Sequence, residues 1–382
     1  MRCLNPGDVE WLETGDEAFA AMLEGIAEAA HSVRFETYTF AVSSLGERFL
    51  AAFVAAARRG VCVQVLVDAF GSLNLPDAFW TPLREAGGEV HWFNPLTLRR
   101  LTFRDHRKLL VCDDAVAWVG GYNVAPEYEG DGVTRGWRDV GLRVRGPLAP
   151  MLASSFDLLF ERHNLEHPPF TRLRPSTARQ SLTCDQGEVL LSGPGRGPNE
   201  FKQRLLDDLA QARQVRIAAA YFLPYGRLRR ALLRAARRGA QVVLVLPGKS
   251  DVRLAQTATR ALYRRFLQAG VEIHEYQPQV LHSKFILVDD AVYIGSSNLD
   301  PRSLHINYEL MVRLGEPAVV AEAQAVFADH LEHSQRIERA AWLASRSWWT
   351  RLKGRWACFL LGRLDRWVMR RQLQRWGELP AA

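Results

Sequence analysis

The order of apolar and polar positions divides the chain into alternating strands and helices. Two apolar runs, VCVQVLVD (61–68) and QVVLVLPG (241–248), are continuous and β-branched, which predicts strands covered on both faces. Residues 226–238 and 252–268 carry apolar side chains three and four positions apart, which predicts amphipathic helices between strands. This alternation predicts an α/β fold with mainly parallel central sheets.

The same series of blocks occurs twice. The string AARRG is found at 56–60 and again at 235–239, each time just before one of the apolar runs. Farther on, DHRKLLVCDDAVAWVGGYN (105–123) corresponds to LHSKFILVDDAVYIGSSN (281–298). Such a long internal repeat predicts two similar α/β halves related by pseudo-two-fold symmetry.

The repeat also suggests the domain boundaries. Residues 163–185 lack periodicity and are rich in Pro, Ser and Thr, which is typical of a linker. We therefore expect a first half at 1–162, a second half at 186–335 and a separate C-terminal tail at 336–382.

Both halves contain a histidine with a lysine two residues later and an aspartate seven residues later. Only five of the 49 basic residues are lysines, so two such matches at equivalent points of a repeat are very improbable by chance. A Gly-rich turn that ends in asparagine follows each aspartate. The candidate catalytic residues are His106, Lys108 and Asp113 in the first half and His282, Lys284 and Asp289 in the second, with Asn123 and Asn298 as candidate phosphate-binding residues.

These residue types fit chemistry at a phosphodiester. Residues i and i+2 of a strand share one face, so each His projects beside its Lys. Histidine can act as nucleophile or proton carrier near neutral pH, and lysine can bind a phosphate oxygen. If the halves meet, one His can attack phosphorus while the other protonates the leaving oxygen, which predicts a phosphohistidine intermediate and requires no metal or cofactor.

A nucleophilic histidine needs a partner that fixes its tautomer. Asp139 and Glu309 lie 33 and 27 residues beyond the two histidines and are the candidates for that role. Ordinary salt bridges are the alternative interpretation of these two carboxylates.

The two motifs resemble the paired HKD motifs of the phospholipase D superfamily. The strings VGGYNVAPEYEG, WRDVGLRVRGP and GSSNLDPRSLHINYE resemble, more narrowly, bacterial cardiolipin synthases of the phospholipase D type. The resemblance implies that a phosphatidyl group is held on one His and passed to a lipid hydroxyl. The usual reaction of that family joins two phosphatidylglycerols to give cardiolipin and glycerol.

The resemblance also implies roles for individual residues. His106 would be the nucleophile and His282 the acid–base group, although the symmetry of the sequence alone leaves the two assignments open. Asp139 and Glu309 would pair with the histidines, and the aspartates of the two motifs would brace the site rather than touch phosphate. Gly121 stands where the general superfamily pattern has Ser, as is common in the synthase branch.

Composition and charge agree with an intracellular protein that meets anionic partners. The net charge is +7, and the five cysteines are scattered without a CxxC pair, so neither a disulfide framework nor a zinc site is indicated. The N-terminus lacks the apolar segment of a signal peptide, and no stretch is long and apolar enough for a transmembrane helix. The longer synthases begin with transmembrane helices, so the chain resembles the short form. We expect a peripheral protein on the cytoplasmic side of the bacterial inner membrane, and a monomer, because an internal repeat can form a complete site.

The tail predicts how the protein contacts a membrane. Residues 336–376 contain six of the eleven tryptophans and eleven basic residues against only Glu338 and Asp365. Apolar residues recur there at helical spacing, which predicts an amphipathic helix lying on an anionic phospholipid surface. A helix packed against the domains is the alternative.

Three other functions are the alternatives to phosphatidyl transfer from phosphatidylglycerol. A phospholipase D would use the same histidines with water as acceptor. A nuclease or other phosphodiesterase would concentrate basic charge at the site, but here the excess charge lies in the tail, so no nucleic-acid partner is expected. A non-catalytic membrane scaffold would not need either histidine.

Overall fold

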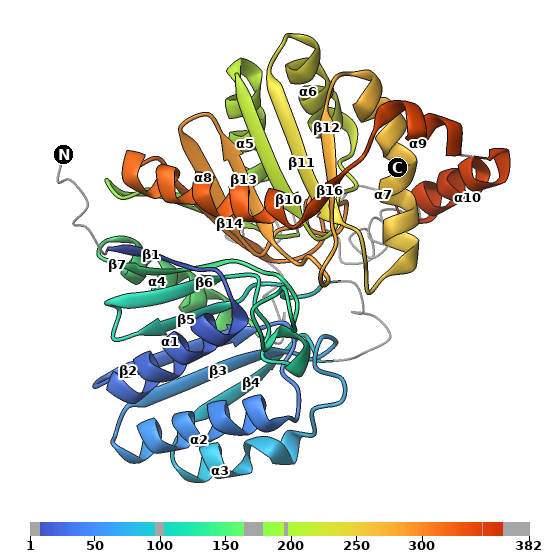
Figure 1. The fold of residues 1–382 in the computed structure, drawn as a ribbon. Coiled ribbons are helices and arrows are strands. Elements are labelled where there is room, and N and C mark those ends of the chain that lie inside the picture. Colours follow the sequence, from blue (N-terminus) through green and yellow to red (C-terminus); the bar gives the residue numbers. More distant parts are fainter. Residues whose placement is uncertain (1–7, 96–102, 164–178, 195–197, 346, 362–382) are drawn as a thin grey trace, which may run out of the picture.

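The computed structural model describes residues 8–95, 103–163, 179–194, 198–345 and 347–361. It contains two α/β halves, each built on one sheet, with the first half below the second in Figure 1. Two α/β halves were predicted from the repeat and a helical tail from the spacing of its apolar residues, and this fold class is confirmed.

The two sheets have the same strand order. The first runs β1 (Val9–Leu12), β7 (Gly141–Arg145), β6 (Val116–Gly120), β5 (Leu109–Cys112), β2 (Ser32–Thr37), β3 (Cys62–Asp68) and β4 (Glu89–Phe93). The second runs β8 (Gln180–Thr183), β9 (Glu188–Ser192), β15 (Glu309–Leu314), β14 (Ala291–Gly295), β13 (Lys284–Val288), β10 (Gln214–Ala219), β11 (Gln241–Pro247), β12 (Glu272–Tyr276) and β16 (Ser334–Arg336). From β9 to β12 the second sheet repeats the first, strand for strand, so the duplication in the sequence is a duplication of topology.

The prediction of mainly parallel sheets is wrong. Among the described strands, only β2–β3–β4 and β10–β11–β12 pair in parallel, and the other pairings are antiparallel. Helices connect the parallel strands, but a three-residue turn joins β5 to β6 and a two-residue turn joins β13 to β14. Strands joined by so tight a turn must be antiparallel.

Helices cover the outer faces of the two sheets. The outer helices of the first half are α1 (Gly15–Glu28), α2 (Ser44–Arg58) and α3 (Thr81–Glu85), and those of the second are α5 (Glu200–Gln211), α6 (Gly226–Arg237) and α7 (Arg253–Gln268). The predicted helices at 226–238 and 252–268 are thus α6 and α7. Each outer set packs on its own sheet around a separate apolar cluster.

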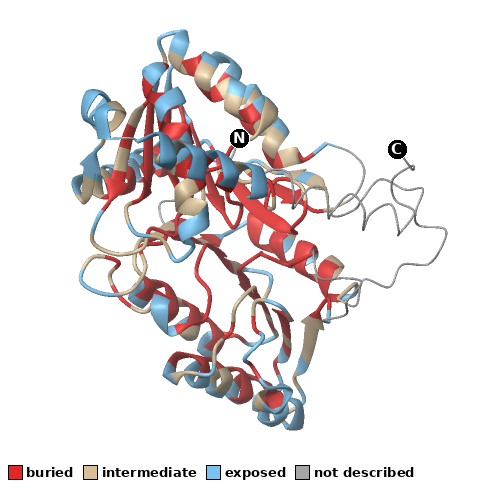
Figure 2. Cartoon of the chain, turned by 90° about the vertical axis from the view of Figure 1, so that its right-hand side faces the viewer, coloured by how far each residue is buried: buried red, intermediate tan, exposed pale blue. Residues whose placement is uncertain are grey.

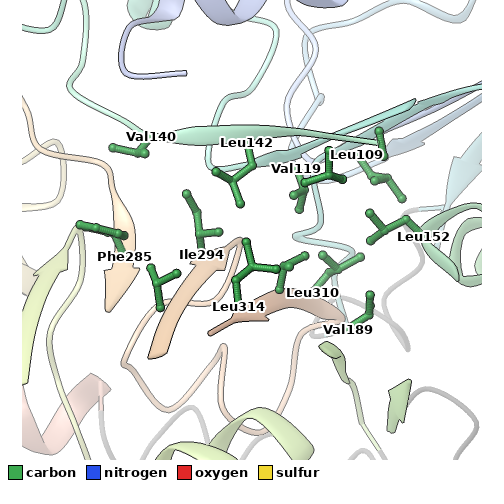
Figure 3. Close-up of a cluster of buried hydrophobic side chains, with 14 of the residues drawn as sticks. Leu109, Val119, Val140, Leu142, Leu152, Val189, Phe285, Ile294, Leu310 and Leu314 are labelled. Carbon is green, nitrogen blue, oxygen red and sulfur yellow. The ribbon is translucent and has the colours of Figure 1, made fainter. Parts of the chain in front are cut away.

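A third apolar core joins the two halves. The inner faces of both sheets enclose it together with α4 (Leu148–Phe160) and α8 (Pro317–Glu332). Figure 3 shows Leu109 and Leu142 of the first sheet facing Ile294 and Leu310 of the second. In Figure 2 the central strands are largely buried, and the outer helix faces are exposed. Because the halves share a core, their relative position is fixed by packing.

The segments outside the halves are described only in part. Residues 164–178 of the expected linker lie outside the described residues, and its end forms the edge strand β8. The tail continues through α9 (Arg339–Ser345) and α10 (Trp348–Phe359), which lie along α7 (Figure 1). No helix of the described chain is long and apolar enough to cross a membrane.

Candidate active site

Two short backbone contacts between the halves position the histidines. Asp105 forms a parallel bridge with Tyr308, and Leu281 forms its counterpart with Arg138. The N–H of His106 donates to the Tyr308 carbonyl at 3.0 Å, and the N–H of His282 donates to the Arg138 carbonyl at 2.7 Å. Each histidine is therefore anchored directly on the other half.

The same contacts give each histidine a carboxylate partner. His106 Nδ1 lies 3.1 Å from Glu309 Oε2, and His282 Nδ1 lies 2.6 Å from Asp139 Oδ2. Asp139 and Glu309 were predicted as such partners without an assignment to a particular histidine. The structure pairs each carboxylate with the histidine of the opposite half.

Both motif lysines are buried next to the histidines. Lys284 Nζ lies 3.0 Å from His282 Nε2, and Lys108 Nζ donates to the backbone carbonyl of His106 at 2.5 Å. Burial and the charge of Lys284 lower the pKa of Lys108 to about 7, and burial lowers the pKa of Lys284 to about 8. An anion bound between them would favour the charged form of both lysines.

Burial also determines the protonation of the other groups. It lowers the pKa of His106, and it lowers that of His282 strongly with the help of the charge of Lys284. It raises the pKa of Asp139 to about 6. Burial acts in the same direction on Glu309, but the charges of His106 and Lys108 outweigh it, so the pKa of Glu309 is lowered and this carboxylate is ionised.

The two histidines differ at their second ring nitrogen. His282 Nε2 lies 3.2 Å from the Tyr128 hydroxyl, and the ring is flanked by Trp137 at 5.5 Å between centroids. His106 Nε2 has no hydrogen-bond partner among the described residues, and the ring of Tyr38 lies 5.0 Å from the His106 ring. The free nitrogen of His106 is the better placed to attack a phosphorus.

Tyr128 and Trp137 were missed as site residues because they are not repeated. Their counterparts in the second half are Ser303 and Asn307. Asn307 Nδ2 donates to Glu309 Oε1 at 3.3 Å, so it supports a carboxylate instead of enclosing a ring. A search based on matching positions cannot find residues that differ between the copies.

The two asparagines also lie in this region, and they differ in their hydrogen bonding. Asn123 accepts from the Thr39 N–H at 3.1 Å and donates to the Tyr128 hydroxyl at 2.7 Å. The Oδ1 atom of Asn298 is buried and has no hydrogen-bond partner among the described residues. A buried polar atom without a partner is costly and is a common feature of binding sites.

A cavity of about 510 Å³ is lined by both histidines and both asparagines. Its volume is in the range of small-molecule sites. Phe70 and Val252, both exposed, lie on its lining from equivalent loops after β3 and β11. Its polar lining includes Arg104, His106, Asn123, Glu127, Tyr128, Tyr221, Asp251, His282, Asn298, Asp300 and Arg302. Within the described ranges, no three His, Cys, Asp or Glu side chains are grouped so that they could hold a metal ion.

Comparison with known proteins shows the family of the chain. The family described as "Cardiolipin synthase, PLD-like domain" matches residues 22–129 and 205–331, which covers both halves. The chain belongs to this family. The resemblance to the phospholipase D superfamily is thereby confirmed.

Individual cardiolipin synthase relatives match along most of the chain. Cardiolipin synthase B of Salmonella typhi is 33% identical over 357 residues, which cover 90% of this chain and 85% of that protein. Cardiolipin synthase 1 of Bacillus anthracis is 30% identical over 340 residues, 86% of this chain and 67% of that protein. The crystal structure of phosphatidylserine synthase from Haemophilus influenzae has a TM-score of 0.73 at 17% identity and 96% coverage of both chains, a likeness of fold.

The aspartates of the motifs do not belong to the cavity of this cardiolipin synthase-family chain. Asp113 accepts the N–H groups of Ala30, His31 and Ser32 at 2.7–2.9 Å, beyond the far end of β5. Asp289 accepts those of Arg213 and Gln214 in the same way. A whole strand separates each aspartate from its histidine, so neither of these two candidate catalytic residues lies at the cavity. They brace the turns after β5 and β13, as the resemblance implied.

The Gly-for-Ser difference at Gly121 has a steric cause. A Cβ at Gly121 would lie 2.2 Å from Asp139 Oδ2, so a side chain there would displace that carboxylate. At the equivalent position of the second half, the Ser296 hydroxyl donates to Glu309 Oε2 at 2.5 Å. The two carboxylates are thus supported differently in this chain: Asp139 by close packing and Glu309 by a hydroxyl.

Proposed function

We propose that the chain transfers a phosphatidyl group from one phosphatidylglycerol to a second one, forming cardiolipin and glycerol. The observation that carries the proposal is the facing pair of histidines, each oriented by a carboxylate of the other half, with two buried lysines beside them. The names of the cardiolipin synthase relatives support the choice of reaction.

The first step forms a phosphohistidine. His106 Nε2 attacks phosphorus, the bond between phosphorus and the glycerol oxygen breaks, and His282 donates the proton that this oxygen takes up. Glu309 holds the Nδ1–H of His106 and stabilises the positive charge that develops on its ring.

The second step returns the enzyme to its starting state. His282 accepts the proton of a hydroxyl on the second phosphatidylglycerol, whose oxygen attacks phosphorus. The bond between phosphorus and His106 then breaks and frees Nε2. Asp139 orients His282 through Nδ1 in both steps.

The two buried lysines beside the histidines supply positive charge that favours the phosphorane-like transition states. Lys108 and Lys284 bind the non-bridging oxygens, and Asn123 and Asn298 contribute amide donors to the same oxygens. Binding of the anionic phosphodiester also raises the pKa of His282, because it offsets the two lysine charges that disfavour the imidazolium.

The proposed setting is a bacterial membrane surface. The phosphatidylglycerol substrate is a membrane lipid, and we place the protein on the cytoplasmic face of the inner membrane as a peripheral enzyme. Both histidines and both carboxylates come from one chain, so a monomer suffices for the reaction.

The test uses purified protein and phosphatidylglycerol vesicles, with lipids and released glycerol followed by mass spectrometry. We expect cardiolipin and glycerol to increase together in the wild type and in His31→Ala, whose histidine is exposed and outside the cavity. His106→Ala and His282→Ala should form neither product. If phosphatidic acid is the main product, water is the acceptor and the chain is a hydrolase. If the wild type turns over no lipid at all, the proposal is overturned.

A further inference from the structure

A second cavity lies beneath the C-terminal helices, outside the catalytic cavity. It has a volume of about 750 Å³ and is enclosed by α7 together with α9 and α10, at the right of the second half in Figure 1. Its basic lining consists of Arg229, Arg260, Arg264, Arg265 and Arg355. No Asp or Glu is among the described residues that line it.

Most of this positive charge is not neutralised. Arg260 forms two hydrogen bonds of 2.8 Å with Glu275. The other four arginines have no carboxylate partner among the described residues. Burial and the charge of Arg265 lower the pKa of Arg229, as expected where like charges gather. A cluster of this kind favours an anion.

The helix α10 is turned so that its aromatic side faces outward. Its inner side consists of small residues: a Cβ at Gly354 would lie 2.6 Å from the Ala261 Cβ, and Cys358 Sγ donates to the Ala258 carbonyl at 3.3 Å. Large aromatic side chains occupy the other side. Trp348, Trp349 and Trp356 have relative exposures of 61%, 57% and 59%.

Exposed tryptophans beside arginines are typical of segments that lie at a membrane interface. α10 packs on α7 through its small residues, as the alternative interpretation of the tail expected, but its aromatic rings lie on the outer side and not in the core. The observed orientation leaves them available to lipid headgroups, and Trp348 also lines the basic cavity.

The helices α7 and α10, which enclose the basic cavity, also lead to the catalytic cavity. Val252, just before α7, and Leu361, just after α10, both line the catalytic cavity. A lipid surface that contacts α10 would therefore extend to the opening of the site that holds His106 and His282.

We propose that the arginine-lined cavity binds the phosphate group of an anionic phospholipid of the bilayer, with the tryptophans of α10 among the headgroups. Guanidinium groups suit this ligand because they bind phosphate oxygens in pairs. The occupied cavity holds the catalytic opening against the membrane. The inference rests on the proposed function for its assumption that substrate is taken from a bilayer.

The test compares two double variants of the full chain with equal loss of charge. Arg264→Gln/Arg265→Gln removes two arginines from the cavity, and Arg234→Gln/Arg237→Gln removes two exposed arginines of α6 that do not line it. Flotation with vesicles of phosphatidylglycerol and phosphatidylcholine, and with phosphatidylcholine alone, measures binding. Calorimetry with inorganic phosphate and with glycerol 3-phosphate measures the affinity for the soluble anion.

We expect the cavity variant to bind phosphatidylglycerol vesicles about thirtyfold more weakly than the wild type, and the α6 variant less than about threefold more weakly. An equal loss in both variants would overturn the proposal, because general charge would then explain binding. Binding of free phosphate as tight as that of vesicles would overturn the lipid assignment. Binding is read without turnover, so failure of the proposed reaction, seen as absence of lipid products, is distinguishable from failure of this site.

Discussion

His106 and Glu309 are 203 residues apart in the chain, yet Nδ1 of the first and Oε2 of the second are joined by a hydrogen bond of 3.1 Å across the two halves. The bond fixes the proton on Nδ1 and leaves Nε2 free for the cavity. His282 has the same arrangement with Asp139, but its Nε2 is in contact with the Tyr128 hydroxyl. This difference distinguishes two otherwise symmetric histidines.

The first prediction separates the two roles. A phosphodiester with a nitrophenolate leaving group needs no protonation of that group, so His282→Ala should still release nitrophenolate in a burst. His106→Ala should release none, because it lacks the nucleophile. On phosphatidylglycerol both variants should lose at least about 10²-fold, as is usual for an acid–base group. Stopped-flow absorbance measures the burst, and a burst in His106→Ala only would reverse the assignment.

A second prediction concerns Glu309 as a positioning residue. Glu309→Gln keeps the size of the side chain but removes the charge that stabilises the His106 imidazolium, so kcat should fall by about 10²–10⁴-fold. KM should change little, and thermal unfolding should show a folded protein. Ser296→Ala, which removes only the supporting hydroxyl, should cost much less. A Glu309→Gln enzyme with the wild-type kcat would contradict this role.

The pH dependence follows from the lysines. A lysine is cationic below its pKa, and the pKa of Lys108 is lowered from 10.5 to about 7 and that of Lys284 to about 8. The charge that binds phosphate is therefore lost as the pH rises through this range, and kcat/KM should fall between about pH 7 and pH 9. Lys108→Arg should move part of this fall to higher pH, since guanidinium stays protonated. A flat kcat/KM profile up to pH 9 would exclude the lysines as its source.

A fourth prediction tests the packing of Asp139. Gly121→Ala places a Cβ where Asp139 Oδ2 now lies, so the carboxylate must move away from His282. We expect a loss of about 1–3 kcal/mol in the free energy of unfolding, together with a large loss of kcat. Gly315→Ala is the control, because its Cβ would meet only the Asp290 carbonyl at 3.6 Å. Denaturant unfolding and turnover measured on both variants decide the point.

The fifth prediction concerns the bracing aspartates. Asp289 has a φ of +47°, which asparagine also tolerates, so Asp289→Asn changes the hydrogen bonds to Arg213 and Gln214 without adding backbone strain. The free energy of unfolding should decrease by about 1–2 kcal/mol, and kcat of the folded protein should stay near that of the wild type. Asp290→Asn, at the next position of the turn, should change neither. A collapse of kcat in folded Asp289→Asn would return this residue to the catalytic set.

Much of this architecture could be predicted from the sequence because the repeat shows the apolar pattern of each element twice. Helices α6 and α7 and the strands at 61–68 and 241–248 lie where their patterns indicated. The direction of the strands was not predicted correctly, since a continuous apolar run shows burial and not the sense of pairing. The tight turns that begin at Asp113 and Asp289 were the sequence signal for antiparallel pairing.

The site was predictable where it is symmetric and hidden where it is not. His106 and His282 were found through matching spacing, and the structure brings them into one cavity. The assignment of Asp139 to His282 depends on contacts between the halves, which no spacing within one copy reveals. Tyr128 and Trp137 occur in one copy only, so nothing in the repeat marked them.

The bridges of Asp105 with Tyr308 and of Leu281 with Arg138 have a consequence for the history of the chain. Each histidine depends on a carboxylate encoded in the other copy, so neither copy was free to drift on its own after duplication. A change that shifts one histidine must be compensated in the opposite copy. The compensating position is 203 residues away for His106 and 143 residues away for His282. The two copies are therefore expected to co-vary across relatives in crossed pairs, while the residues that enclose each ring diverge independently.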